Sequence, residues 1–265
     1  MQIVVLIKQV PETSNVKMDP ETGTMVRSGL ASIINPLDLY AIESALQLRE
    51  QHGGRVVALS MGPASARRAL EEAIAMGCDE GVLLSNKKFA GADTWATSYV
   101  LVQAMRRLGE FDVIICGERA TDGDTGQVGP GIAALLDLPL ATYVTRLYDA
   151  SPEGMRIERA VEDGLEVLWT SLPVVLTVIK EVGTPRMPTL RRRLQARSAE
   201  IAVWGPDEIE ADPANLGLKG SPTRVVKIEK AHVARKGDFI EVKTKAEAQD
   251  AAERLVAYLH DQHLI

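Results

Sequence analysis

The chain is poor in the residue types on which several common kinds of site depend. Its 265 residues include only two cysteines, four histidines and 4% aromatics. Cys78 and Cys116 lack the spacing of metal ligands, and no histidine pairs with a nearby cysteine or glutamate. We therefore expect no metal site, and interpret both cysteines as core thiols in a reducing compartment. The scarcity of aromatics argues against a base-stacking surface for nucleic acids.

Charge and hydropathy exclude two further classes of protein. The net charge is −6, so no broad nucleic-acid-binding surface is expected. The chain has no apolar run of about 18 residues, so we expect no membrane span. Its first apolar run is short and ends at Lys8, which argues against a signal peptide and favours a cytoplasmic protein. The 46% hydrophobic and 25% charged fractions are typical of a globular protein with a substantial core.

Strand and helix patterns alternate along the first 140 residues. The β-branched run Ile3–Ile7 predicts a buried strand, and Asn35-Pro36 predicts the start of a helix that ends at Gly53-Gly54, with Asn35 as its N-cap. Similar patterns predict strands at 55–60, 81–84 and 112–116, and helices at 62–76, 93–108 and 132–136. This alternation predicts an α/β fold: a Rossmann-like parallel sheet, of the adenine-nucleotide-binding kind, with helices on both faces.

The pattern changes after residue 140. Four apolar runs predict strands that either extend the sheet or form a small antiparallel addition: 141–145, 155–159, 165–169 and 173–179. From 183 onward apolar runs are short, which predicts an extended C-terminal arm that packs on a partner. A terminal helix is expected from Lys245 to about His260. We therefore predict a nucleotide-binding domain over 1–183 and an arm with a terminal helix over 184–265.

The most informative stretch is the signature loop, Gly117–Pro130. It follows a predicted strand and precedes an apolar helix, an arrangement in which backbone N–H groups and the helix dipole bind phosphate. Glycines allow the backbone to approach a ligand closely, and Thr125 and Gln127 add side-chain donors. By spacing alone, a purely structural glycine-rich turn explains the stretch equally well.

Four loops are predicted to meet at one edge of the sheet, because ligands of such sheets bind beyond the carboxyl ends of the strands. They follow Ile7, surround Asn35, follow Leu59, and cover 117–129. Their convergence predicts a site for a nucleotide-like ligand.

Six motifs, in chain order, resemble the beta subunit of electron transfer flavoproteins. Together they cover essentially the whole chain, and their order is more specific than any single motif. They are Val5–Pro11, Asn35–Ala45, Leu59–Pro63, Ala75–Asp79, Gly117–Pro130 and Gly183–Leu190.

The signature loop also resembles one subgroup of that family. Subunits that bind AMP as a structural element commonly read Asp-Asp-Asp-Cys-Asn-Gln-Thr-Gly, whereas this chain reads Asp122-Gly-Asp-Thr-Gly-Gln-Val-Gly129. The latter is similar to electron-bifurcating members, in which the beta subunit holds a second FAD. Gly123 in place of an acidic residue removes a charge and a side chain near the second phosphate of a dinucleotide. FAD is therefore the favoured cofactor, with AMP as the alternative.

This resemblance implies a flavin-dependent electron carrier that works with an alpha subunit. NADH would deliver a hydride to the FAD of the beta subunit. One electron would pass to ferredoxin or flavodoxin, and the other, through the FAD of the alpha subunit, to an acyl-CoA dehydrogenase-type flavoenzyme. Because the flavin carries the redox chemistry, we predict binding residues and no catalytic acid or base.

The resemblance places the cofactor on residues from all four loops. Thr125, Gln127 and the backbone of 126–129 are expected at the phosphates, and Ile7 and Lys8 near the adenine. The predicted cofactor-binding residues are Ile7, Lys8, Asn35, Asp38, Ser60, Met61, Gly62, Gly117, Ala120, Asp122, Gly123, Asp124, Thr125, Gly126, Gln127, Val128 and Gly129. For Asn35 and Asp38, favourable roles at the start of a helix are an equally good explanation.

Two further sites follow from the resemblance. Leu190 matches an apolar anchor for the dehydrogenase, and the arginines after it form a basic rim: Arg191, Arg192 and Arg193. A solvated basic helix is the plainer interpretation. Glu166 aligns with an acidic position near the flavin of the alpha subunit, although an ordinary exposed strand glutamate explains it as well.

Functions of other classes remain as alternatives. An ordinary beta subunit would bind AMP and serve as a scaffold. A stand-alone adenine-nucleotide-binding regulatory module would leave 183–265 without a purpose. An ATP pyrophosphatase needs a Ser-Gly-Gly-x-Asp-Ser loop after the first strand, where this chain has Lys8–Pro11, so we reject that class.

Overall fold

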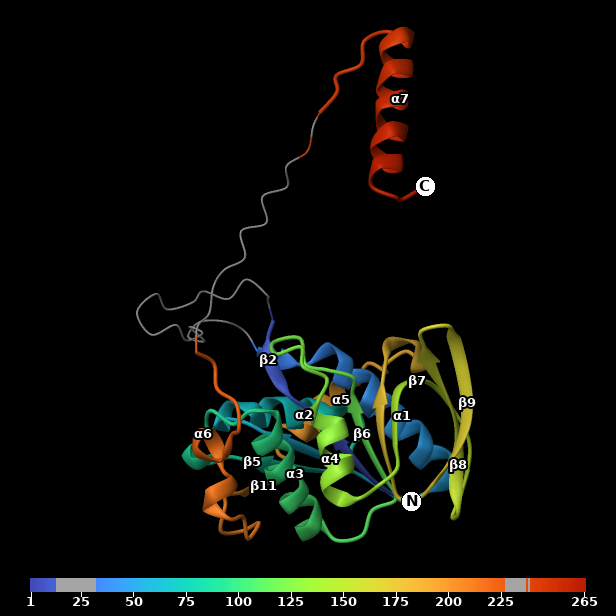
Figure 1. Ribbon diagram of the computed structural model, residues 1–265. Coiled ribbons are helices and arrows are strands. Elements are labelled where there is room, and N and C mark those ends of the chain that lie inside the picture. The colour runs from blue at the N-terminus through green and yellow to red at the C-terminus, as the bar shows by residue number, and fades with distance from the viewer. Residues whose placement is uncertain (13–31, 227–236, 238) are drawn as a thin grey trace. The chain divides into compact units, whose positions relative to one another are not determined.

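The computed structural model describes residues 1–12, 32–226, 237 and 239–265 (Figure 1). The chain divides into two compact units, Met1–Val226 and Lys227–Ile265. The first unit contains a nine-stranded sheet and its surrounding helices. The second contains helix α7, Lys245–Asp261, close to the predicted terminal helix. This helix begins with a capping box between Thr244 and Glu247.

The main sheet has the strand order β11-β5-β4-β1-β6-β10-β7-β8-β9. Seven strands are parallel, from β11 to β7, and β8 and β9 continue the sheet as antiparallel strands. The predicted α/β fold is therefore confirmed, and the later strands both extend the sheet and form an antiparallel addition. The strands are β1 Gln2–Leu6, β4 Arg55–Met61, β5 Glu80–Leu84, β6 Val113–Gly117, β7 Leu140–Ser151, β8 Gly154–Val161, β9 Gly164–Ser171, β10 Val174–Val178 and β11 Ile201–Trp204.

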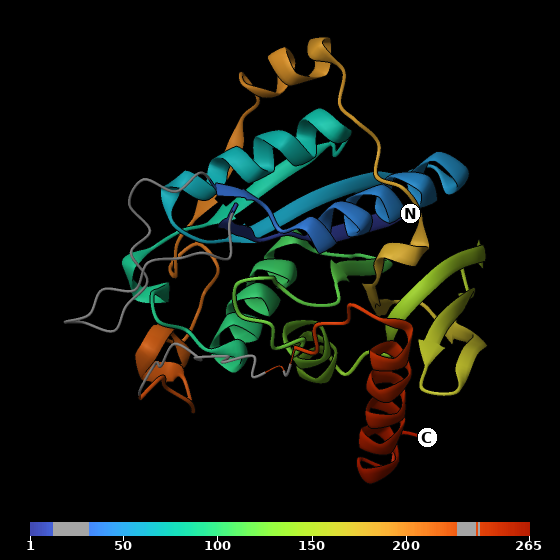
Figure 2. The same ribbon diagram turned by 90° about the horizontal axis from the view of Figure 1, so that it is seen from above.

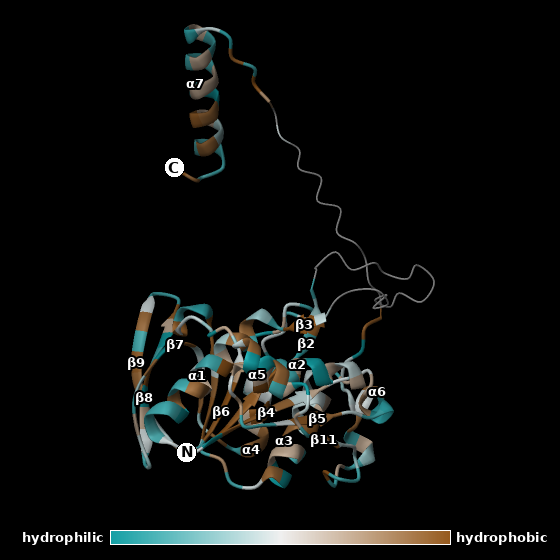
Figure 3. Ribbon diagram, turned by 180° about the vertical axis from the view of Figure 1, so that it is seen from behind, coloured by the Kyte–Doolittle hydropathy of each residue, from teal (hydrophilic) through white to brown (hydrophobic). Residues whose placement is uncertain are grey.

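Helices cover both faces of the parallel strands (Figure 2). Helices α1 (Pro36–His52) and α2 (Arg67–Met76) lie on one face, and α3 (Thr94–Leu108) and α4 (Val128–Leu136) on the other. Alternate side chains of each strand enter opposite cores, as Ile3 and Val5 do on the α1 face and Val4 does on the α3 face. The central parallel strands β4, β1, β6 and β10 are buried on both faces and are hydrophobic along most of their length (Figure 3).

Shorter elements complete the described chain. A two-stranded antiparallel sheet pairs β2 with β3 next to the first loop. The remaining elements are β2 Gln9–Pro11, β3 Ser32–Ile34, α5 Leu190–Ala196, α6 Gly217–Gly220, and the 3-10 turns η1 Ala64–Ala66, η2 Lys87–Phe89, η3 Lys180–Val182 and η4 Pro213–Asn215. No helix among the described residues is both long and apolar enough to cross a membrane.

Helix α4 begins at Val128, earlier than the predicted start at Ile132. The sequence Gly129-Pro130-Gly131 looks like a helix breaker, yet proline fits the first turn because the N–H there needs no partner. The glycines are explained by close packing. A Cβ at Gly129 would lie 2.6 Å from Thr177 Cγ2, and one at Gly131 would lie 2.6 Å from Ser98 Oγ.

The segment after residue 183 contributes to the sheet. The sequence places a boundary at 183, whereas strand β11 pairs in parallel with β5 and the first compact unit extends to Val226. Ile201 is buried in the core between β5 and α2, where it packs near Gly81 and Ile74. A single apolar run of four residues is thus enough to complete the sheet when a neighbouring strand supplies the hydrogen bonds.

Candidate functional site

Loops from three strands and one helix meet at the carboxyl edge of the sheet, as the sequence predicts. The backbone N–H of Ile7 donates to the carbonyl of Leu59, 3.0 Å away, which joins the ends of β1 and β4. Gln9 Nε2 donates to the carbonyl of Ser65 at 3.0 Å, which joins the loop after β1 to the loop after β4. The same edge receives the start of α1 and the loop after β6, through Asn35 and Asp38.

Asn35 joins the start of α1 to the signature loop. Its side chain is fully buried, and Nδ2 donates to Asp38 Oδ1 and to the carbonyl of Arg119, both at 2.9 Å. Its Oδ1 accepts the backbone N–H of Thr121 at 3.1 Å. The predicted capping of α1 by this side chain is wrong: Asn35 makes no side-chain cap hydrogen bond, because its amide bonds to the Asp38 side chain and to the loop instead. Asn35 therefore positions the loop.

Asp38 is a buried carboxyl that joins two strand ends. It accepts the backbone N–H of Lys8 at 2.7 Å and that of Gly117, as well as the amide of Asn35. Burial raises the pKa of Asp38 to about 7, which outweighs the three hydrogen bonds and the charge of Lys8 that favour the carboxylate. With these partners in place, the Asp38 side chain holds the start of α1 against the ends of β1 and β6.

The raised pKa of Asp38 predicts a pH dependence of stability. A carboxyl whose pKa rises from 3.8 to about 7 on folding binds more protons in the folded state between those values. Its contribution is complete below about pH 4 and is lost as the pH rises through 7, so unfolding becomes easier by about 2–4 kcal/mol over that range. Urea unfolding at several pH values measures this slope.

The matched variant is Asp38→Asn, which cannot titrate. We expect the free energy of unfolding of the native chain, minus that of the variant, to decrease between pH 4 and pH 7 and to be constant above pH 8. Parallel profiles for the two proteins would show that Asp38 does not titrate in this range.

Two residues of the signature loop have a left-handed backbone, and its acidic side chains lie close to cations. Asp124 and Gly126 have φ values of 53° and 63°. Asp can adopt this conformation and glycine does so without strain. Lys8 Nζ lies 2.6 Å from Asp122 Oδ1, and Arg119 Nε lies 3.1 Å from Asp124 Oδ1. Arg119 also lies 3.6 Å from Glu118, so two cations face the three acids of the loop and offset most of their negative charge.

The start of α4 provides donors for such a ligand. Within the described part of the chain, no side chain caps this helix, whose N-cap is Gln127. The N–H groups of its first turn and the positive end of its dipole are therefore suited to an anion. Gly129 is buried against Thr177, while Thr125 and Gln127 are exposed beside the same turn.

Thr94 belongs to this site and was missed from the sequence. Its hydroxyl donates to Gln127 Oε1 at 2.9 Å, which places the first residue of α3 beside the first turn of α4. Asp93 caps α3 by accepting the N–H of Ala96 at 3.0 Å. The Asp93-Thr94 pair is a recognisable helix start, but its position next to Gln127 depends on how α3 packs on α4.

The end of β4 contributes a buried hydroxyl. Ser60 Oγ is fully buried, and among the described residues it is one of two buried side-chain polar atoms without a hydrogen-bond partner. Such atoms are uncommon and mark places where a ligand can bind. Met61 is half-buried, and the N–H of Gly62 donates to the carbonyl of Leu84 at 3.0 Å. Ser60 is therefore a buried hydroxyl at the end of β4, close to the edge where the loops meet.

The remaining predicted residues lie on other elements. Glu166 is on β9, at the end of the sheet order, where its Oε2 lies 2.7 Å from Arg159 Nε. Leu190 begins α5 and is 74% exposed. Arg191 and Arg193 are exposed, but Arg192 Nη1 donates to the carbonyl of Met76 at 3.2 Å, so this arginine also attaches α5 to α2.

The cysteines are buried, as predicted. Burial raises the pKa of both the Cys78 and the Cys116 thiols to about 12, so neither forms a reactive thiolate near neutral pH. In the described ranges, no group of three His, Cys, Asp or Glu side chains is arranged to hold a metal ion.

Sequence comparisons identify related proteins. The electron transfer flavoprotein domain matches residues 22–209. The "Electron transfer flavoprotein subunit beta" of Thermoanaerobacterium thermosaccharolyticum is 45% identical over 266 residues, covering 100% of both chains. The "Caffeyl-CoA reductase-Etf complex subunit CarD" of Acetobacterium woodii is 39% identical over 266 residues, again covering 100% of both. "Protein FixA" of Azorhizobium caulinodans is 43% identical over 235 residues, covering 86% of this chain and 84% of its own.

Proposed function

The chain belongs to the electron transfer flavoprotein family, among its beta subunits, and we propose that it binds FAD at the signature loop. In this proposal the FAD accepts a hydride from NADH. One electron goes to ferredoxin or flavodoxin, and the other, through the FAD of an alpha subunit, to an acyl-CoA dehydrogenase-type enzyme. The observation that carries the proposal is the uncapped start of α4 beside a loop whose acids are paired with cations.

The residues of the site bind and orient the cofactor. When bound, the flavin would supply the chemistry of hydride acceptance and of single-electron transfer. The first turn of α4 and the side chains of Thr125 and Gln127 hold the phosphates. Ser60 offers its hydroxyl to the nucleotide, while Asn35 and Asp38 keep the loops after β1 and β6 at a fixed separation. The remaining predicted binding residues contribute backbone groups and space.

Gly123 supports FAD over AMP. A Cβ at this position would have no atom within 4 Å, so the loop itself does not require glycine. An aspartate here would therefore fit, but would add a negative charge to a loop that already carries Asp122 and Asp124. The absence of that charge favours the two phosphates of a dinucleotide. The relatives named CarD and FixA are compatible with a role in electron transfer.

The test is the nucleotide content of the purified heterodimer of this chain with its alpha subunit. We expect two FAD and no AMP in the native heterodimer after denaturation. Gly123→Asp is expected to lower the FAD content of the beta subunit or replace it by AMP, because a carboxylate near a diphosphate weakens binding by about 1–2 kcal/mol.

Gly123→Ala is the matched control, since it adds a Cβ without charge, and it should retain two FAD. One FAD and one AMP in the native protein would exclude FAD at this site and leave an ordinary beta subunit that binds AMP. A monomeric, colourless chain that binds ATP would instead support a stand-alone regulatory module.

An outward apolar surface on β9 is the proposed contact with the alpha subunit. Leu165, Val167 and Trp169 alternate along this edge strand and are 64%, 54% and 58% exposed. Alternate residues share one face of a strand, so the three form a continuous apolar surface. Such surfaces mark protein interfaces. Glu166 points to the other face, and its proposed place near the alpha-subunit flavin is compatible with the edge position of β9.

The second unit is proposed as an arm on the same partner. Helix α7 has no buried residue, and its exposed apolar side chains include Leu255, Val256 and Tyr258. An amphipathic helix that buries none of its apolar side chains needs another surface for stability. We propose the alpha subunit as that surface.

Helix α5 is the proposed docking element for the dehydrogenase-type partner. Leu190 and Leu194 are exposed one turn apart on α5, Met187 is exposed just before the helix, and Arg191 and Arg193 are exposed on the same helix. The segment is held in place, since Arg186 Nε lies 2.8 Å from Glu43 Oε2. A fixed apolar anchor with a cationic rim is suited to a pocket on an acidic partner.

A further inference from the structure

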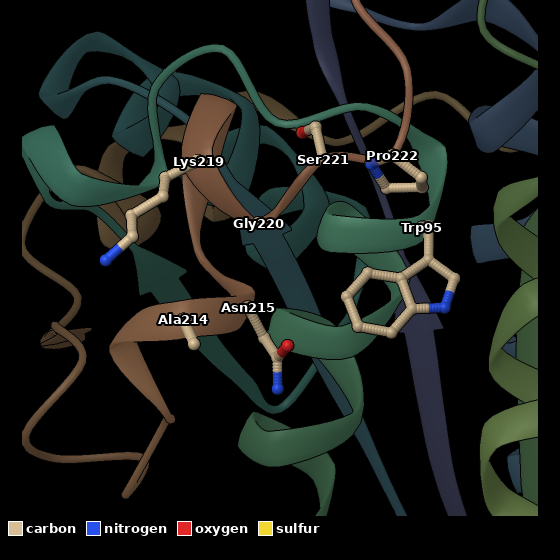
Figure 4. A pocket seen from close by; sticks show the side chains of 7 residues that line it. All are labelled: Trp95, Ala214, Asn215, Lys219, Gly220, Ser221 and Pro222. Carbon is tan, nitrogen blue, oxygen red and sulfur yellow. The ribbon is translucent and has the colours of Figure 1, made fainter.

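An open cavity of about 370 Å³ lies beside the start of α3 (Figure 4). The indole of Trp95 forms one side, and the segment 214–222 forms the rest. The view shows the indole next to Pro222 and the amide of Asn215, while Lys219 extends outward at the rim. The predicted cofactor residues include none of these.

The wall of the cavity is fixed by hydrogen bonds to the cap of α3. Asp93 Oδ2 accepts the backbone N–H of Thr223 at 2.9 Å and its hydroxyl at 2.8 Å. The N–H of Asp93 donates to Ser221 Oγ at 2.8 Å, and that hydroxyl donates to the carbonyl of Gly217 at 2.7 Å. One aspartate thus both caps α3 and holds the chain that follows α6, so the cavity is a built feature of the fold.

The indole is held in a fixed orientation with much of its surface open. Trp95 stacks on Tyr99, with ring centroids 5.9 Å apart and planes 5° apart, and it is 40% exposed. The hydroxyl of Tyr99 accepts the N–H of Asp212 at 2.9 Å, which immobilises the second ring. A rigid, exposed indole is well suited to stack on another planar ring, because little conformational entropy is lost on binding.

The cavity adjoins the proposed cofactor site along the chain. Thr94, which precedes Trp95, donates to Gln127 at the start of α4. Two consecutive residues of α3 therefore connect the two places: Thr94 contacts the start of α4, and Trp95 lines the cavity. The groups present are an aromatic face, an amide that can donate and accept, and an ammonium at the rim, which together match a heteroaromatic ring, its polar edge and a phosphate.

We propose that the Trp95 cavity binds the planar heteroaromatic ring of a nucleotide, stacked on the indole, with Asn215 at the ring edge. This inference rests on the proposed function, because a nucleotide on the signature loop brings such a ring to the start of α3. The ring belongs either to the FAD held on that loop or to a second nucleotide, for which NADH is the probe.

The test compares native heterodimer with Trp95→Ala, Trp95→Phe and, as a matched control, Trp204→Phe. Flavin fluorescence and the Kd for NADH are measured on each. If the flavin ring stacks on Trp95, Trp95→Ala raises flavin emission several-fold, since the quenching indole is gone. If a second nucleotide stacks there, the same variant weakens NADH binding roughly tenfold with flavin emission unchanged. Trp95→Phe should recover most of the NADH affinity, because a phenyl ring also stacks, but not the quenching, which depends on the indole. Trp204→Phe should change neither.

Lys219→Ala provides a variant that cannot fail through folding, because its side chain reaches into solvent at the rim. It should weaken nucleotide binding by a few-fold, more at low salt than at high salt. Native flavin emission and native NADH affinity in Trp95→Ala would overturn the proposal. Failure of the proposed function is separate: it appears as AMP in the native heterodimer, in which the NADH titration of Trp95→Ala still decides whether the cavity binds a ring.

Discussion

Replacing Gly117 by alanine is expected to destabilise the protein by about 2–4 kcal/mol and to abolish stable cofactor binding. A Cβ at Gly117 would lie 2.6 Å from Asp38 Oδ1 and 2.8 Å from the backbone carbon of Leu37. The second contact is with backbone, so α1 has to move away from β6. That movement separates Asp38 from its donors and releases the signature loop from Asn35. Thermal unfolding and the nucleotide content of the heterodimer measure the two effects.

Gly123→Ala serves again as the control, because it makes the same change in the same loop without any neighbour within 4 Å. Its melting temperature should stay within a few degrees of that of the native protein. Equal stability of the two variants would contradict the close approach of α1 to the end of β6. If the Gly117→Ala protein is destabilised but keeps its native cofactor content, then the attachment of the signature loop to α1 is not needed for cofactor binding.

A glutamate at Val167 is expected to weaken the heterodimer by at least about 3 kcal/mol, more than a hundredfold in Kd. The side chain lies in the middle of the apolar surface on β9, between Leu165 and Trp169. A partner that covers this surface has to bury the new carboxylate without a counter-charge. Analytical ultracentrifugation or titration with the isolated alpha subunit measures the change.

Val203→Glu is the matched control. Val203 is also 54% exposed and lies on β11, the strand at the opposite edge of the same sheet. The intrinsic effect of an exposed valine-to-glutamate change on an edge strand is therefore the same in both variants. If both weaken the heterodimer equally, β9 is not the interface; if neither does, the alpha subunit binds elsewhere.

The sequence predicts most of the sheet and the place of the site because both depend on local patterns. The run Ile3–Ile7 is apolar on both faces, as only a strand covered on both sides can be. Asn35-Pro36 and Gly53 mark the ends of α1. Once the strands are parallel, the loops at 117–129 and around Asn35 must share one edge, so the site follows from topology.

What the sequence does not reveal depends on contacts between distant residues. The side chain of Asn35 could cap its own helix, but the loop 84 residues later offers better partners for its buried amide. Thr94 is an ordinary helix start until α3 packs beside α4. The run Ile201–Trp204 is too short to specify a strand, and it becomes one because β5 has a free edge. Each outcome is decided by tertiary packing.

Helix α5, the proposed docking element, lies between two strands of the same sheet. The chain leaves the sheet at β10, in its interior, crosses α1 and α2 through Arg186 and Arg192, and re-enters at the far edge as β11. A segment that is held at both ends and along its length is rigid and preorganised. If the proposed partner docks here, it meets a surface that is already in its bound shape, and binding loses little conformational freedom. Any large motion needed for electron transfer then belongs to other parts of the assembly.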